Sequence, residues 1–179
     1  LIVDFAAIHR EPGHKEHEYF DTNVIGSKNI SYLADKLDCK NIIFTSSISV
    51  YGPGNHEKNE NTQTLPNTAY GRSKLEAEKI YTNWQNNNFT HKSLTICRPG
   101  VVFGPGENGN VTRLVKILKN RLFFFMGNKN LNKSGIYIKE LINSILWVNE
   151  NQINQKFDKK VIFNGTLYTC PTLEDYVNE

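Results

Sequence analysis

Long apolar runs are absent from this sequence, and cysteine is scarce. The longest stretch of large apolar side chains, residues 122–126, is far shorter than the roughly 20 residues that a transmembrane helix needs. The three cysteines Cys39, Cys97 and Cys170 are odd in number and lack the spacing of a metal site. We therefore expect reduced thiols in a cytoplasmic protein that does not associate with a membrane.

An excess of one charge is also missing. The 21 Lys and Arg residues against 18 Asp and Glu residues give a formal net charge of +3, and the basic residues are scattered. We expect no nucleic-acid partner, because such binding needs a concentrated basic surface. His9, His14 and His17 are close in sequence but irregularly spaced, so we expect no metal site either.

The chain does not begin with methionine, and its only methionine is Met126. No secretory signal precedes the polar residues His9 and Arg10. The missing initiator methionine predicts a chain that starts inside a longer protein, or one whose terminus was edited or processed. The 179 residues are 39% hydrophobic and 22% charged, which is typical of a globular domain.

Strand and helix patterns alternate along the first hundred residues. Short apolar runs are typical of buried parallel strands, and the segments between them carry apolar stripes at helical spacing. This order predicts right-handed crossovers and a parallel sheet covered by helices on both faces. We expect strands at 1–7, 41–45, 93–97 and 122–126, and helices at 19–37, 69–84, 111–120 and 139–149.

A glycine pattern at Gly104–Gly109 matches the G-x-G-x-x-G of dinucleotide-binding loops, and it precedes a helix. Pro105 removes one amide from the turn, and the segment before it is short for a central strand. No acidic residue follows about twenty positions later to bind a ribose. We interpret the pattern as an ordinary glycine-rich loop.

Tyr70 and Lys74 are the best candidates for chemistry. Four residues apart on a helix, they lie on one face, and a nearby ammonium favours the phenolate form of a tyrosine. Their helix follows a strand that ends at Thr45, followed by Ser46 and Ser47. Because open α/β sheets bind ligands at the carboxyl ends of their strands, Ser47 could bond the substrate oxygen that Tyr70 protonates or deprotonates.

Five sequence segments carry a further signal, in the order Phe5–Ala7, Asp21–Gly26, Phe44–Gly52, Tyr70–Lys74 and Arg98–Gly106. Together and in this order they resemble the extended short-chain dehydrogenase/reductases, in particular their nucleotide-sugar epimerase/dehydratase group. The resemblance implies a doubly wound parallel-sheet α/β domain of the Rossmann type.

The resemblance also implies residue roles. Ser47 would polarise the substrate, Tyr70 would be the catalytic acid/base, and Lys74 would lower the pKa of Tyr70 and hold the nicotinamide ribose. The implied cofactor is NAD, with NADP possible, and the implied substrate is a nucleotide sugar. The residues implied at the cofactor are Phe5, Ala6, Ala7, Asn23, Thr45, Tyr70, Lys74 and Pro99; those at the substrate are Ser47, Asn110 and Lys133.

The chain departs from the family at its amino-terminal side. The family's glycine-rich phosphate loop and first three strands have no counterpart here, so we expect only the carboxyl-terminal half of the Rossmann domain. Residues 1–104 would be the partial NAD(P)-binding domain. Residues 105–179 would be part of a small carboxyl-terminal substrate lobe, interleaved with the last strands. Asp4 stands where the family often has histidine.

The activity implied is that of an NAD-dependent UDP-sugar 4-epimerase, with transient hydride transfer to bound NAD. Dehydratases of the family place Asp-Glu after the polarising hydroxyl, whereas Ile48 and Ser49 follow Ser47 here. Two alternatives remain: an NAD(P)H-dependent reductase of a keto-sugar or small carbonyl compound, and a non-catalytic relative or inactive fragment. By analogy with the family, we expect a homodimer that pairs through helices 19–37 and 69–84.

Overall fold

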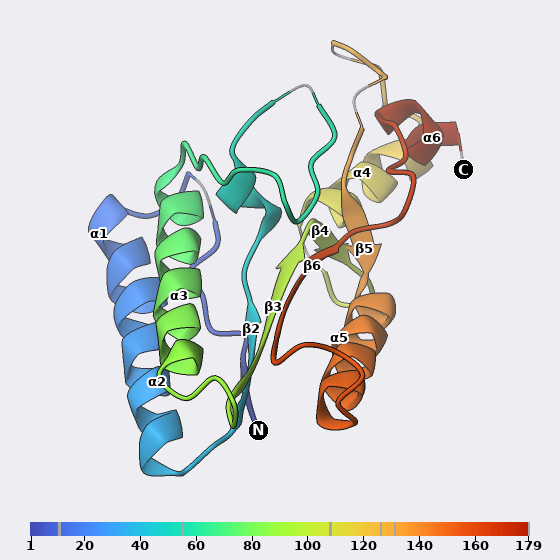
Figure 1. Ribbon diagram of the computed structural model, residues 1–179. Helices are drawn as coiled ribbons and strands as arrows, with labels where there is room; N and C mark the ends of the chain where they lie inside the picture. Colours follow the sequence, from blue (N-terminus) through green and yellow to red (C-terminus); the bar gives the residue numbers. More distant parts are fainter. Residues whose placement is uncertain (11, 55, 108, 126, 131, 179) are drawn as a thin grey trace. The chain divides into compact units, whose positions relative to one another are not determined.

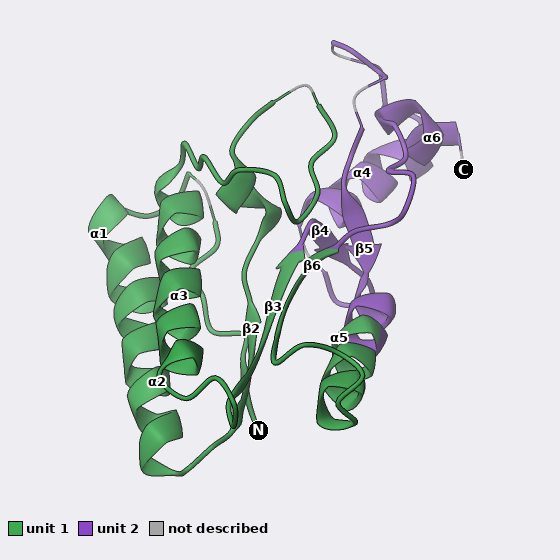
Figure 2. Ribbon diagram, in the orientation of Figure 1, with its two compact units in different colours: residues 1–98, 144–164 green, residues 99–143, 165–179 purple. Residues whose placement is uncertain are grey.

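The computed structural model describes residues 1–10, 12–54, 56–107, 109–125, 127–130 and 132–178. The chain divides into two compact units (Figure 2). Unit 1 comprises Leu1–Arg98 and Ser144–Asn164, and unit 2 comprises Pro99–Asn143 and Gly165–Glu179. The functional boundary expected at residue 104 stays a prediction, because these units follow packing and not ligand binding.

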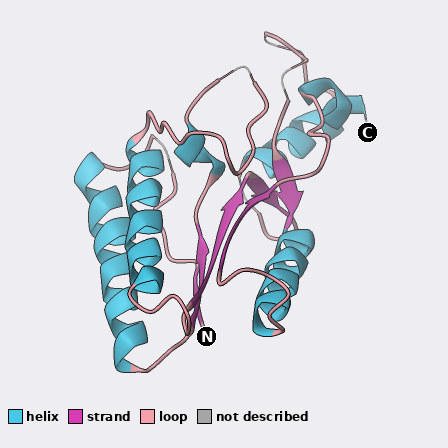
Figure 3. Ribbon diagram, viewed as in Figure 1, coloured by secondary structure: helices cyan, strands magenta, loops and turns pink. Residues whose placement is uncertain are grey.

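Helices and strands alternate along the chain, as Figures 1 and 3 show. Over the described residues, no helix has both the length and the apolar character that crossing a membrane requires. The strands are β1 (Ile2–Asp4), β2 (Asn41–Thr45), β3 (Ser93–Pro99), β4 (Val101–Phe103), β5 (Gly135–Tyr137) and β6 (Lys160–Gly165). The helices are α1 (Glu16–Tyr19), η1 (Phe20–Ile25), α2 (Gly26–Lys36), η2 (Ile48–Tyr51), α3 (Ala69–Asn86), α4 (Asn110–Lys119), α5 (Ile138–Ile153) and α6 (Leu173–Asn178).

A four-stranded sheet has the order β1-β2-β3-β6. Strand β2 runs parallel to both β1 and β3, and Phe44 lies between Asp4 and Ile96 in register. In unit 2, β4 and β5 form a separate parallel pair. The prediction of a parallel sheet with flanking helices is confirmed, and the carboxyl ends of β1, β2 and β3 lie at one edge of the sheet.

The two faces of β3 are covered by different helices of unit 1. Leu94 and Ile96 join Tyr81 of α3 in the buried core on one face. Between them in sequence, Thr95 donates a hydrogen bond of 2.6 Å to Gln152 of α5. Because side chains alternate along a strand, the part of α5 in unit 1 covers the opposite face from α3 (Figure 2).

Residues 16–36 form one continuous helix whose middle, η1, is π-helical, where the sequence predicts an ordinary helix from residue 19. A π-helical turn changes the angular spacing of side chains and is frequent at functional sites. The polar residue Asn23 lies in this turn and is buried. The helix therefore carries both an apolar stripe and a polar group that faces the interior.

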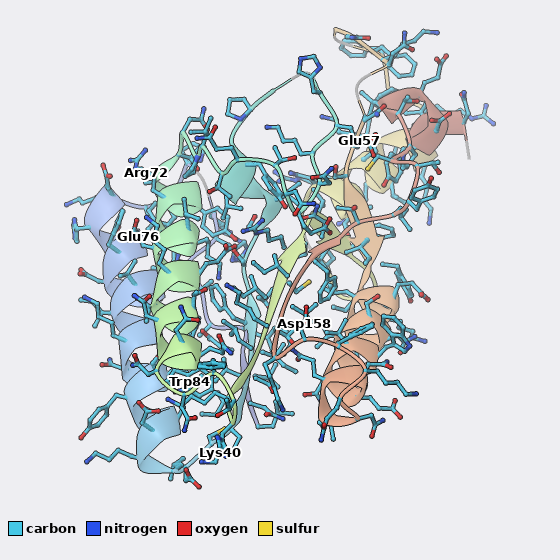
Figure 4. All side chains as sticks on the ribbon, viewed as in Figure 1. Lys40, Glu57, Arg72, Glu76, Trp84 and Asp158 are labelled. Carbon is cyan, nitrogen blue, oxygen red and sulfur yellow. The ribbon has the colours of Figure 1, made fainter. Side chains whose placement is uncertain are left out.

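Helix α3 is tied to the α1–α2 helix near both ends. Figure 4 shows Arg72 and Trp84 at opposite ends of α3. Arg72 pairs with Glu16 at 2.7 Å. At the other end, Trp84 Nε1 donates to Asp35 over 2.8 Å, and Lys92 Nζ lies 2.7 Å from the same carboxylate oxygen. Such surface pairs add little stability, but they fix the position of α3 along the helix formed by residues 16–36.

Candidate active site

Tyr70 and Lys74 stand in the first two turns of α3. Thr68 caps this helix, because its Oγ1 accepts a hydrogen bond of 3.0 Å from the Gly71 amide. The cap determines where the helix begins and hence the direction of both side chains. The Tyr70 ring also contacts the Tyr19 ring, with 6.3 Å between centroids. The predicted acid/base pair is thus carried by a fixed helix terminus.

Lys74 is buried among apolar and acidic neighbours. Its Nζ lies 4.3 Å from the centroid of the Phe44 ring. Burial lowers the pKa of Lys74 to about 8, and the negative charges of Asp4 and Glu78 oppose that effect. Lys74 is therefore mostly charged at neutral pH and titrates just above it. A buried ammonium of this kind can stabilise a phenolate on the same helix face.

Two hydroxyl groups lie at the carboxyl end of β2. Ser47 caps the short helix η2: its Oγ accepts from the Ser49 amide and donates to the Ser49 hydroxyl, each over 3.1 Å. Thr45 Oγ1 is buried and has no hydrogen-bond partner among the described residues. Ser47 is therefore oriented by its turn, whereas Thr45 has an unused donor and acceptor.

Asn23 connects the segment after β1 with α3. Its Oδ1 accepts from the Ile8 amide over 3.0 Å, and its Nδ2 donates to the Ile8 carbonyl and to Ser73 Oγ over 3.2 and 2.9 Å. Ser73 Oγ in turn donates to the Tyr70 carbonyl over 2.8 Å. Asn23 thus positions the residues that follow Phe5–Ala7; its direct contact with a cofactor stays a prediction.

The sequence motifs did not single out a buried ion pair between Glu78 and Arg98. Glu78 Oε1 accepts from Arg98 Nε over 2.9 Å and from Ser46 Oγ over 2.5 Å, and Oε2 accepts from Arg98 Nη2 over 2.6 Å. Arg98 Nη1 donates to Tyr51 Oη over 2.9 Å, and Tyr51 Oη in turn donates to Asn164 Oδ1 over 2.8 Å. Burial alone would lower the pKa of Arg98, but its bonds to Glu78 and Tyr51 raise it.

This network joins four elements, α3, β3, η2 and β6, and the Ser46 segment that follows β2, next to the candidate catalytic residues. Glu78 is one helical turn beyond Lys74, and Ser46 adjoins Ser47. Two signals could have revealed it: an acidic residue four positions after Lys74, and an arginine at the end of the apolar strand β3.

Three predicted residues belong to unit 2. Pro99 is the last residue of β3. Asn110 begins α4 and accepts a hydrogen bond of 2.7 Å from Arg113. The exposed Lys133 donates its backbone amide to the Pro171 carbonyl over 2.9 Å. Their roles at cofactor and substrate stay predictions.

The glycine-rich loop before α4 already contains an anionic group. Glu107 Oε2 accepts from the Thr112 amide over 2.9 Å and from the Thr112 hydroxyl over 2.7 Å. These bonds hold the pKa of Glu107 below its usual value. A carboxylate at the start of α4 uses an amide that a phosphate would need, in agreement with our interpretation of residues 104–109 as an ordinary loop.

A hollow of about 250 Å³ lies between η2 and the start of α3, beside the candidate catalytic residues. A larger hollow of about 450 Å³ lies around the amino-terminal ends of β1 and β2 and contains none of the predicted site residues. The smaller hollow is lined by Ile48, Ser49, Gly52, Pro53, Asn67 and Thr68.

Cysteines take no part in this site. Cys39, Cys97 and Cys170 are free thiols, and burial raises the pKa of Cys97 to about 12. Over the described residues, no three His, Cys, Asp or Glu side chains are grouped so that they could hold a metal ion.

Comparison with known proteins places the chain in a family. Residues 1–162 match the model of the NAD dependent epimerase/dehydratase family, and the chain belongs to this family. Over 150 residues it is 38% identical to the N-acetyl-alpha-D-glucosaminyl-diphospho-ditrans,octacis-undecaprenol 4-epimerase of Escherichia coli O157:H7, covering 84% of this chain and 45% of the relative. Over 155 residues it is 31% identical to the UDP-glucose 4-epimerase of Vibrio cholerae, covering 82% and 46%. The chain thus spans about half the length of these curated relatives.

Solved structures show the same fold. A UDP-glucuronic acid 4-epimerase from Bacillus cereus in complex with NAD has a TM-score of 0.81 and 21% identity, covering 97% of this chain and 56% of that chain. A UDP-glucose 4-epimerase has a TM-score of 0.83 and 18% identity, covering 98% and 59%. The family resemblance seen in the sequence is confirmed, and so is the Rossmann-like fold.

Proposed function

We propose that the protein is an NAD-dependent nucleotide-sugar 4-epimerase of the UDP-sugar type. The observation that carries this proposal is the buried Lys74, which lies on the face of α3 that also bears Tyr70. The strand-end residues Thr45 and Ser47 supply further hydroxyls. Both curated relatives described above are named 4-epimerases, which supports this choice within the family.

In the proposed mechanism, Tyr70 removes the proton of the sugar C4 hydroxyl and later returns a proton to the same oxygen. The Lys74 charge stabilises the Tyr70 phenolate, and Ser47 donates a hydrogen bond to the reacting oxygen. Because both groups bind the oxygen and not one face of the ring, they can serve either epimer. The redox chemistry of the two half-reactions is supplied by NAD when it is bound.

The residues present fit the nicotinamide end of that cofactor. The unpartnered buried Thr45 Oγ1 offers a hydrogen bond, and the Lys74 ammonium can hold a ribose hydroxyl. Phe5 and Ala6, which follow the carboxyl end of β1 at the same edge of the sheet, are exposed residues.

The test is Tyr70→Phe in the whole protein, with UDP-sugars as substrates. We expect turnover to fall at least about 100-fold, since a positioned acid/base contributes that much or more, while the melting temperature changes little because the ring remains. Tyr168→Phe, at a tyrosine that is 96% exposed, is the matched control and should retain full activity. Unchanged turnover in Tyr70→Phe would overturn the mechanism.

A second candidate substrate is a sugar joined through diphosphate to a polyprenol. The relative at 38% identity bears such a name, whereas the relative named for UDP-glucose is 31% identical. Offering the two substrates at equal concentration decides between them. If only the polyprenol-linked sugar is converted, it replaces the nucleotide sugar as the proposed substrate. Net consumption of NADPH with either compound would indicate a reductase instead.

The homodimer also stays a proposal, as does the cytoplasmic location. Leu33 of α2 and Leu37, the C-cap residue that follows α2, are apolar and exposed. A contact with a second copy would bury them.

A further inference from the structure

Asp4 is a buried carboxylate to which the mechanism above gives no role. It ends β1, and both its oxygens are used. Oδ1 accepts from the Ala6 amide over 3.0 Å, and Oδ2 accepts from Tyr81 Oη over 2.6 Å. Asp4 therefore connects α3 to the backbone of Phe5–Ala7, the segment proposed to contact the cofactor.

Asp4 is also one of four charged side chains buried together in unit 1. Asp4, Lys74, Glu78 and Arg98 are each at most 4% exposed, and their formal charges sum to zero. Glu78 and Arg98 neutralise each other through their two direct hydrogen bonds. One carboxylate and one ammonium remain, those of Asp4 and Lys74.

Asp4 and Lys74 both lie next to Phe44: Asp4 is the Cα partner of Phe44 in the β1–β2 register, and Lys74 Nζ lies 4.3 Å from the centroid of the Phe44 ring. Among the described residues no salt bridge within 4.0 Å joins the two, yet the charge of Asp4 favours the charged form of Lys74 more strongly than does that of Glu78. Charges separated by protein interior are screened much less than charges at the surface. A counter-ion that is not in contact can therefore still offset part of the cost of burying the ammonium.

We propose that Asp4 is a positioning residue for the reaction. Its carboxylate fixes the Phe5–Ala7 backbone against α3, and its negative charge is the counter-ion that keeps the Lys74 ammonium charged beside Tyr70. This inference rests on the proposed epimerase function for its consequence in catalysis. The electrostatic link between Asp4 and Lys74 can be measured without any turnover.

The other groups around Lys74 do not replace this charge. Glu78 is already bound to Arg98. Burial and the bond to Asp4 raise the pKa of Tyr81, so Tyr81 remains a neutral donor throughout the working pH range. Tyr70, on the same helix as Lys74, adds a negative charge only when it acts as the base. Asp4 is thus the one unneutralised anion that the described residues place near Lys74 before the reaction begins.

The decisive variant is Asp4→Asn, which keeps the shape of the side chain. The Asn oxygen still accepts from Ala6, and its amide can donate to Tyr81, so the fold should be retained. An NMR titration of the Lys74 side chain should show its pKa falling by about one pH unit from the wild-type value, since the loss of a nearby opposite charge shifts a pKa by that order. The alkaline limb of the pH–kcat profile should move in the same direction.

Two further variants separate electrostatics from structure. Tyr81→Phe removes one hydrogen bond but leaves the Asp4 charge, so the melting temperature should fall while the Lys74 titration stays in place. Asp38→Asn, at an exposed carboxylate, should change neither the melting temperature nor the Lys74 titration. Should Asp4→Asn not fold, Asp4→Ser, whose hydroxyl can still accept from Ala6, is titrated in the same way.

An unmoved Lys74 titration in Asp4→Asn would overturn the proposal, and so would an equal shift in Tyr81→Phe. Failure of the proposed function gives a different result: the whole protein would convert no UDP-sugar, or Tyr70→Phe would be fully active, while the Lys74 titration would still respond to Asp4.

Discussion

At the residue scale, Glu78 and Arg98 show what a buried charge needs in order to be tolerated. A carboxylate removed from water loses several kcal/mol of solvation, which only direct hydrogen bonds and an opposite charge can restore. Here Arg98 supplies two of those bonds and Ser46 a third. Arg98 in turn bonds Tyr51. The pair therefore stabilises the fold only while both partners are present.

Arg98→Met should lower the free energy of unfolding by about 3–5 kcal/mol, because it leaves Glu78 buried without its cation. Urea denaturation followed by circular dichroism measures this loss. The double variant Arg98→Met/Glu78→Gln should be more stable than Arg98→Met alone, since the uncompensated charge is then gone. Additive losses in the double variant would contradict this account.

At the element scale, the approach of α3 to η2 depends on a single glycine. A Cβ on Gly71 would lie 2.6 Å from the Ser49 carbonyl oxygen, closer than real Cβ atoms approach. The first turn of α3 can therefore sit against η2 only because residue 71 has no side chain. This close packing places the start of α3, which carries Tyr70, against the short helix that Ser47 caps.

Gly71→Ala should reduce stability by about 1–3 kcal/mol, as overpacking does, and should lower kcat because Tyr70 adjoins the displaced turn. Gly26→Ala is the matched control: it also lies within a helix, but nothing lies within 4 Å of its added Cβ. Ala there should raise stability by about 0.5–1 kcal/mol, because alanine is the better helix former. Thermal unfolding of the two variants tests the predicted loss of stability in Gly71→Ala and the predicted gain in Gly26→Ala. A stabilised Gly71→Ala would show that α3 is not tightly packed against η2.

Element prediction from the sequence succeeded where periodicity was strong. β2, β3 and α3 lie where the apolar patterns predict them. The strand expected at 122–126 is wrong over residues 122–125, which are irregular, and residue 126 lies outside the described residues. An apolar run forms a strand only where a partner strand is available to accept and donate its backbone hydrogen bonds. In unit 2 the strand β4 pairs with β5 and not with residues 122–125.

At the scale of the whole molecule, the reactivity of the Cys97 thiol shows whether unit 1 is folded. It lies in β3, fully buried, while Cys39 and Cys170 are partly exposed. Both burial and the pKa of about 12 keep the Cys97 thiol unreactive in the native protein. Its reaction should therefore require the sheet to open.

With a thiol reagent at pH 8, we expect Cys39 and Cys170 to react first and Cys97 to react only as unit 1 unfolds. Mass spectrometry of peptides identifies each thiol, and increasing urea should bring Cys97 labelling into line with the loss of circular dichroism. Cys39, in the same unit, is the internal control. Equal rates for Cys97 and Cys39 without denaturant would show that β3 opens locally.

The sequence by itself determined the strand–helix alternation, the family and the Tyr70–Lys74 pair, because these depend on local spacing along one element. Only the tertiary structure decided which charges surround Lys74. Asp4 and Arg98 come from β1 and β3, and Asn23 joins the site through a π-helical turn. Contacts between elements depend on sheet register and helix packing, which no local sequence pattern encodes. These contacts form without a long apolar run and without a disulfide bond among the described residues. The environment that sets the Lys74 charge is therefore a property of the fold.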